Sequence, residues 1–255
     1  MNQVFEIARL TFADAIRNRI AYGVFAFLII TLSTSIVLAS VTMGRTELMI
    51  LDLGLGFISI LGNLMAIIIT IQALQQEREN KTLYVLITRL DSRWKYLLGK
   101  FLGLAAILGI QLLIMCLLLA LAIFPFGEIY WSSFIQACIA TVLEVWIIIA
   151  ISMLFAQSSS LFLAILFTLA TDVTGRFTSV IRQFGEQSDT NLLQWVTEAM
   201  FYALPNFEAI NLRNGAGYIE SYTLHHFLTV LSYATIEVVF LLTICAWIFS
   251  RKNLS

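Results

Sequence analysis

Charged residues are scarce in this chain, and their scarcity excludes most soluble folds. Lysine, arginine, aspartate and glutamate make up 12% of the 255 residues, whereas hydrophobic residues make up 60%. A soluble domain of this size carries about twice that share of charge. The mean hydropathy is +0.89. Because an unpaired backbone polar group is costly in lipid, this composition predicts an all-α integral membrane protein.

Proline, cysteine and histidine are scarce as well. Two prolines and 13 glycines exclude a collagen-like or low-complexity chain. The three cysteines, Cys116, Cys138 and Cys245, lie in apolar segments and lack the spacing of a metal site or a disulfide framework. His225 and His226 are adjacent, so on a helix they point in different directions and indicate an interfacial polar pair better than a metal site.

Motifs for chemistry and for nucleic acid are also missing. The sequence has no Gly-x-x-x-x-Gly-Lys-Ser/Thr loop to hold a phosphate, because Gly99-Lys100 is followed by Phe101 and Trp94 stands where the first glycine belongs. ATP hydrolysis is therefore not expected from this chain, and no cofactor or metal site is predicted in it. The net charge is −1 and no basic face lies outside one loop, which gives no support for nucleic-acid binding.

Long apolar runs dominate what is present. A run of about 20 apolar residues can cross a bilayer as a helix. Five runs have the required length or more, and a sixth is short and ends near Asp172 and Arg176. In chain order the runs are Ile20–Val41, Leu53–Leu74, Phe101–Phe126, Trp131–Ala156, the short Leu161–Thr171, and Phe227–Phe249. The sequence therefore predicts one domain, residues 1–255, with six transmembrane helices.

The basic residues predict the orientation. With the N-terminus inside, 11 lysines and arginines fall on the cytoplasmic side and four on the outer side. The outer four are Arg45, Arg176, Arg182 and Arg213. Because cytoplasmic loops of membrane proteins are enriched in lysine and arginine, both termini are expected to be cytoplasmic. The protein itself is expected in the inner (cytoplasmic) membrane of the cell.

Two segments outside the spans have helical periodicity. Residues 1–19 predict an amphipathic helix lying on the cytoplasmic leaflet. Its apolar side is formed by Val4, Phe5, Ala8, Phe12, Ala15 and Ile16. Residues 175–226 form the one long outer segment. Two apolar sets at helical spacing, around Phe177–Phe184 and Leu192–Ala203, predict two short re-entrant helices that dip into the outer leaflet.

The charged stretch from Gln75 to Lys100 separates the second and third spans. It holds six of the 15 basic residues of the protein. Leu83, Leu86 and Leu90 recur at helical spacing and predict a short helix parallel to the membrane. Gly99 and Gly103 then form a Gly-x-x-x-Gly pattern that allows close contact with another helix.

This stretch resembles the first cytoplasmic loop of the type 2 ATP-binding-cassette (ABC) permeases, which are six-span subunits, often exporters. The matching residues are Glu77, Glu79, Thr82, Leu83, Leu86, Ser92, Arg93, Gly99 and Lys100. The segment Leu204–Arg213 resembles the family's segment before the last span, and residues 1–19 resemble its elbow helix. Two positions depart from the family pattern, Leu90 where proline is usual and Lys81 where glycine is frequent.

The resemblance implies a function and partners. It implies the permease subunit of an export-type transporter, completed by a second copy or a homologue. A separate ATPase subunit, which binds ATP and Mg, would dock on a coupling helix within residues 75–98. The residues to which this ATPase-coupling role would carry over are Glu77, Glu79, Thr82, Leu83, Leu86 and Arg93.

Two carboxylates lie in the middle of predicted spans, Glu144 and Glu237. An ionised carboxylate there costs about 2.5–3.5 kcal/mol, so each should be protonated, paired or facing a polar cavity. They could line the substrate path or the subunit interface, or each could be a neutral carboxyl bonded to a neighbouring helix. Two rival classes stay open: an intramembrane lipid-modifying or proteolytic enzyme using both carboxylates, and a channel or scaffold independent of ATP.

Overall fold

The computed structural model describes residues 2–18, 24–31, 33–34, 46–79, 93–125, 129–187 and 191–251. These residues form helices and no strand within the described ranges, which confirms the all-α prediction. The elements are α1 (Asn2–Asn18), α3 (Thr46–Glu79), α5 (Arg93–Ile123), α6 (Trp131–Ser158), α7 (Leu161–Arg176), α8 (Thr178–Glu186), α9 (Asn191–Ala203), α10 (Phe207–Ile210), the 3₁₀ turn η1 (Arg213–Gly215) and α11 (Leu224–Arg251).

Four of the described helices are long and apolar enough to cross a membrane: α3, α5, α6 and α11. Helices α7 and α8 meet at an angle of 59° and would add a fifth crossing if they are taken together. More than half of the first predicted span, Ile20–Val41, lies outside the described residues. Its described parts, residues 24–31 and 33–34, are helical. A multi-pass membrane protein is therefore supported, and the count of six spans stays a prediction.

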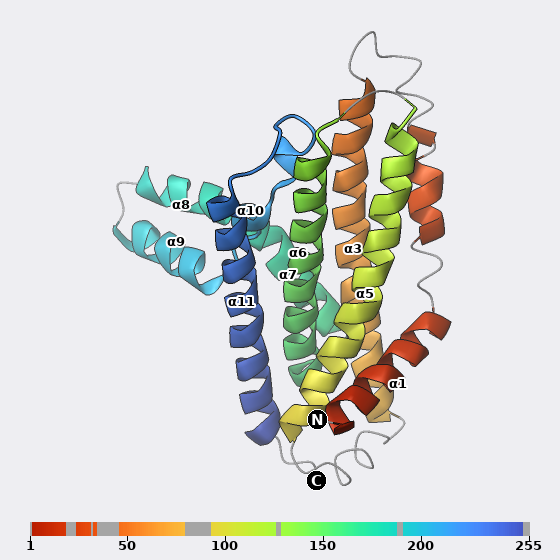
Figure 1. Ribbon diagram of the computed structural model, residues 1–255. Coiled ribbons are helices and arrows are strands. Elements are labelled where there is room, and N and C mark those ends of the chain that lie inside the picture. Colours follow the sequence, from red (N-terminus) through yellow and green to blue (C-terminus); the bar gives the residue numbers. More distant parts are fainter. Residues whose placement is uncertain are drawn as a thin grey trace.

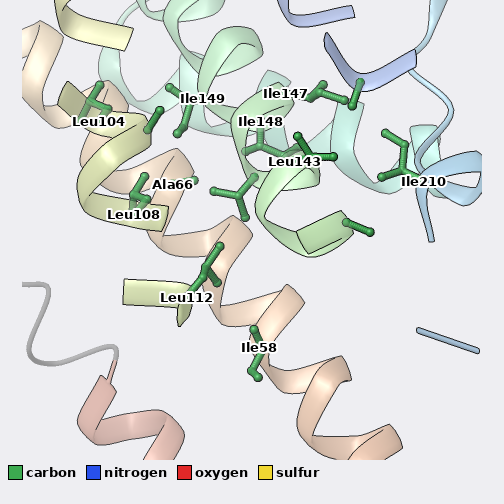
Figure 2. Packing of buried hydrophobic residues seen from close by; sticks show 14 of the residues in the cluster. Ile58, Ala66, Leu104, Leu108, Leu112, Leu143, Ile147, Ile148, Ile149 and Ile210 are labelled. Carbon is green, nitrogen blue, oxygen red and sulfur yellow. The ribbon is translucent and has the colours of Figure 1, made fainter. Parts of the chain in front are cut away.

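The long helices stand side by side as one bundle, with α6 at its centre (Figure 1). Helix α6 packs against α3, α5, α7 and α11. In an apolar stretch of 18 residues, 72% of α6 is buried inside the protein, against 17% of the corresponding stretch of α11. Figure 2 shows core side chains from α3, α5, α6 and α10, among them Ile58, Leu108, Ile148 and Ile210. Since lipid is as apolar as these side chains, close packing holds the helices together.

Helix α1 lies across α5 at one end of the bundle (Figure 1). A Cβ atom on Gly99 would lie 2.8 Å from the Cβ of Ile7, and one on Gly103 would lie 2.7 Å from the backbone oxygen of Ala8. The predicted close contact at this glycine pair is therefore confirmed, and the partner is α1. The amphipathic helix expected in residues 1–19 is present, while its position on a leaflet stays a prediction.

Contacts at the two ends of the bundle fix the path of the chain. The aromatic ring of Tyr96 stacks on that of Phe249, 5.9 Å between centroids, so the end of α11 lies at the α1 end. At the opposite end Asp52, near the start of α3, accepts a hydrogen bond of 2.7 Å from the hydroxyl of Tyr218. Helix α3 thus begins at the end of the bundle opposite α1.

The predicted outer segment contains two helices, α8 and α9, that pack on each other and project sideways from the bundle (Figure 1). Helix α7 ends at Arg176, where Gly175 lies close to the ring of Phe207 and to the backbone oxygen of Pro205. Large apolar side chains of α8 and α9 are exposed, including Phe184 and Trp195. These exposed faces fit the predicted re-entrant helices, whose depth in the outer leaflet stays a prediction.

Candidate functional site

Glu144 is buried in the middle of α6, about 20 Å from either end of the helix at 1.5 Å per residue. Its Oε1 atom lies 2.5 Å from Nη2 of Arg176, and its Oε2 atom lies 3.4 Å from Nη2 of Arg213. Two side chains of α3 also donate to it, Ser59 at 3.3 Å and Asn63 at 3.0 Å. Of the three states expected for this carboxylate, the structure shows the paired one.

A second carboxylate joins the same group. Asp172 lies one turn before Arg176 on α7, and its Oδ1 atom lies 3.2 Å from Nη2 of that arginine. The Nδ2 atom of Asn63 donates to Asp172 at 3.3 Å as well as to Glu144. We call the six side chains together the central charge cluster. Its members are Ser59, Asn63, Glu144, Asp172, Arg176 and Arg213.

The central charge cluster holds two carboxylates and two guanidinium groups, so its formal charge is zero. A lone charge at the centre of a bilayer costs several kcal/mol, and pairing offsets much of that cost. Among the four charged members, 3% of the side chain of Glu144 and 12% of that of Asp172 are exposed, against 14% for Arg213 and 28% for Arg176. Glu144 is thus the most buried of the four charged side chains and Arg176 the most exposed.

The two arginines reach Glu144 from different kinds of element. Arg176 ends the regular helix α7, whereas Arg213 begins the short 3₁₀ turn η1. The Oδ1 atom of Asn211 orients Arg213 by accepting from its backbone N and from its Nε, at 3.1 and 2.9 Å. Burial lowers the pKa of the Arg213 guanidinium, and the nearby Glu144 opposes that shift. Arginine keeps its proton near neutral pH, so burying it removes water from a charged group and does not neutralise that group.

The segment carrying Arg213 is fastened to the end of α6. Ser133 accepts a hydrogen bond of 3.0 Å from the backbone N–H of Gly217, whose φ of +78° favours glycine. Gln136 makes two bonds to the backbone of Tyr222, one accepted at 2.8 Å and one donated at 3.3 Å. These contacts hold the turn η1 over the bundle interior, and Arg213, which the sequence pattern predicts on the outer side, lies beside Glu144.

The structure does not bring the two predicted intramembrane carboxylates together. Glu237 is half-buried on α11, and within the described ranges it makes no hydrogen bond or ion pair with Glu144. The described residues also contain no group of three histidine, cysteine, aspartate or glutamate side chains that could hold a metal ion. The enzyme alternative, which the matching depth of Glu144 and Glu237 left open, is not tested by these contacts.

A second charged site lies at the α1 end of the bundle. Glu77, near the end of α3, pairs with the Nζ atom of Lys100 on α5 at 2.6 Å and accepts a hydrogen bond from the hydroxyl of Tyr96. Lys100 and Tyr96 are both buried. Since α3 ends at Glu79 and α5 begins at Arg93, this pair joins the two ends of the loop. We call Glu77, Tyr96 and Lys100 the loop base.

Most of the predicted coupling loop falls outside the described residues. Thr82, Leu83 and Leu86 lie in the range 80–92, and only the backbone of Arg93 is described. Glu79 is exposed at the end of α3, whereas Glu77 is turned into the loop base. The roles of all six predicted coupling residues stay predictions.

Sequence reasoning identified Glu144 and missed its partners. The sequence pattern predicts Asp172 and Arg176 only as the end of a short span, and Arg213 only as an outer charge. One signal was available: Asp172 and Arg176 are four residues apart and of opposite sign, a spacing that pairs side chains on one helix face. The contact of Arg213 had no such signal, because it depends on how residues 177–212 fold back.

Comparison with known proteins places the whole chain in one group. The family model described as "ABC-2 family transporter protein" matches residues 5–254. A protein of Stutzerimonas stutzeri named "Probable ABC transporter permease protein NosY" is 32% identical over 160 residues. That match covers 59% of this chain and 58% of the relative, so it spans somewhat more than half of the relative's length.

Proposed function

The chain belongs to the ABC-2 family of transporter proteins, and we propose that it is the transmembrane permease subunit of an ABC exporter driven by a separate ATPase. The observation that carries the proposal is the family match over residues 5–254 on an all-α bundle with several candidate spans. The named relative supports the permease role, since its printed name is that of an ABC transporter permease. Export and the ATPase partner are parts of the proposal.

The loop base supports the proposed site of coupling. A loop that transmits force must be fixed to the helices it moves, and the loop base ties the ends of α3 and α5 through a pair of 2.6 Å. We assign the two acidic residues different roles. The exposed Glu79 contacts the ATPase, while Glu77 anchors the loop.

At the other end of the bundle, we propose that the segment following α9 closes the outer mouth of the pathway. Arg213 of this segment reaches the middle of α6, and Gly217 and Tyr222 bond to the end of that helix. Movement of the coupling loop would be transmitted along α3, which carries both Glu77 and the cluster residue Asn63. Alternating access would then follow from rigid-body movements of the helices.

Co-purification with an ATPase tests this function. The full chain is expressed with an ABC ATPase subunit from the same genome, and the complex should hydrolyse ATP. The double variant Glu79→Lys, Leu86→Asp should reduce recovery of the ATPase at least tenfold, because it reverses a charge and breaks the apolar face of the predicted helix.

The matched control for that experiment is Glu186→Lys, which reverses an exposed charge on α8, far along the chain from the loop. It should retain the ATPase at the level of the unaltered protein. Equal recovery with the loop variant would contradict docking on residues 75–98. Substrate flux without any ATPase would favour the channel alternative.

A further inference from the structure

We propose that the central charge cluster is a binding site for a cationic group of the transported molecule, and that Arg213 occupies this site as a tethered substitute while the mouth is closed. The inference rests on the proposed permease function and specifies the class of its cargo. It depends on the charge balance of the cluster, on the way Arg213 is held, and on one unpaired atom.

The charge balance of the cluster indicates that the ligand carries a positive charge. With all four charged residues in place, the cluster is neutral. When the segment carrying Arg213 withdraws, Glu144 and Asp172 face Arg176 alone, and one negative charge is left in excess. An excess charge inside the bilayer is costly until an opposite charge neutralises it. A cation entering the open mouth would restore the neutrality that Arg213 supplied.

The contacts distinguish the replaceable arginine from the permanent one. Arg176 pairs with both carboxylates, at 2.5 and 3.2 Å, and extends from a regular helix. Within the part of the chain that the structure describes, Arg213 pairs only with Glu144, at 3.4 Å, and it extends from a three-residue turn. The two arginines also use different oxygens of Glu144, so Arg213 can leave Oε2 while Arg176 stays on Oε1.

A buried amide adds an independent sign of a missing donor. Asn63 is 1% exposed, and its Nδ2 atom donates to both carboxylates. That arrangement sets the orientation of the amide, because an oxygen in place of Nδ2 would face two acceptors. Its Oδ1 atom is buried and has no hydrogen-bond partner among the described residues. A cation with N–H groups, such as an amine or a guanidinium, could donate to Oδ1 and to Glu144 together.

Binding of benzylguanidinium tests the proposal without an ATPase. The purified full chain in phosphatidylcholine nanodiscs is titrated by calorimetry, with benzylsulfonate as the anion of similar size. Arg213→Gln should bind benzylguanidinium at least tenfold more tightly than the unaltered protein, because the site is vacated, and should show no gain for benzylsulfonate. Adding Glu144→Gln to this variant should abolish the gain.

An affinity for benzylguanidinium within twofold of the unaltered protein, or an equal gain for both ions, would overturn the proposal. If Arg213→Gln does not fold, Arg213→Lys provides the test. Benzylguanidinium should displace the lysine from Glu144 and speed its reaction with an amine reagent, whereas benzylsulfonate should not. An unchanged rate would also overturn the proposal.

Failure here leaves the permease function standing, since ATPase docking is measured separately. Conversely, Glu79→Lys with Leu86→Asp should not alter benzylguanidinium binding, because these residues lie in or beside the loop joining α3 to α5 and not in the cluster.

Discussion

At the residue scale, Glu144 is the side chain around which the central charge cluster is built. It receives two guanidinium groups, an amide and a hydroxyl, and these come from α3, α7 and η1. Asp172 has a narrower role, because among the described residues it forms an ion pair only with Arg176. Neutralising Glu144 and neutralising Asp172 should therefore lower the free energy of unfolding by different amounts.

Glu144→Gln should lower the free energy of unfolding by about 3–5 kcal/mol, the usual cost of removing one partner of a buried ion pair. Asp172→Asn should cost less, because Glu144 still pairs with both arginines. The measurement is thermal or SDS unfolding of the purified protein in detergent. The double variant Glu144→Gln, Arg213→Gln serves as the control and should recover part of the loss. A larger loss for Asp172→Asn would contradict this ranking.

At the element scale, the contact between α1 and α5 depends on two glycines one turn apart. The backbone of α1 lies where side chains at these positions would be: a Cβ on Gly99 would lie 2.9 Å from the oxygen of Val4. Helix α1 turns Ile7 and Thr11 toward the bundle and exposes Phe5 and Leu10. The predicted amphipathic helix is thus present, and its predicted apolar side is divided: Phe12 packs against the core, whereas Phe5 is exposed.

Gly103→Ala should push α1 away from α5 and cost about 1–3 kcal/mol, because the added methyl group would lie 2.7 Å from a backbone oxygen that cannot turn aside. Gly109→Ala is the matched control on the same helix, where the nearest atom would be 3.9 Å away. Spin labels at the exposed positions Arg9 and Leu102 would report the displacement as a longer distance. Equal distances in both variants would show that α1 is not held by this contact.

At the scale of the whole molecule, two polar sites stand at different depths of one apolar bundle. The loop base joins α3 to α5 at the α1 end, and the central charge cluster joins α3, α6 and α7 to η1 at mid-depth. Helix α3 takes part in both. One continuous helix therefore connects the loop base with the central charge cluster.

Lys100→Met should loosen the loop base and cost about 1–3 kcal/mol, since Glu77 loses its charged partner. Amide hydrogen exchange should become faster in residues 75–100. In the proposed complex with an ATPase subunit, the rate of ATP hydrolysis should fall. Arg251→Met is the control, because Arg251 is exposed at the same end and lies over the ring of Trp247 at 4.3 Å. Unchanged exchange in Lys100→Met would mean that the pair does not fix the loop.

The sequence by itself determined the class of the protein. Scarce charge and long apolar runs require helices in lipid, and the motif from Glu77 to Lys100 indicated the family that the comparison then showed. The sequence also identified the glycine pair, because its two members are four residues apart on one helix. It identified Glu144 because a carboxylate in the middle of an apolar span is energetically unfavourable unless it is neutralised.

Only the tertiary structure decided which residues neutralise Glu144. Arg213 is 69 positions away in the numbering and was assigned to the outer side, yet the bend after α7 and the fastening of Gly217 and Tyr222 to α6 bring it within 3.4 Å. Periodicity describes neighbours along one helix, whereas this ion pair depends on how separate elements pack. For the same reason Glu77, one of the residues expected to couple to an ATPase, was found turned into the protein beside Lys100.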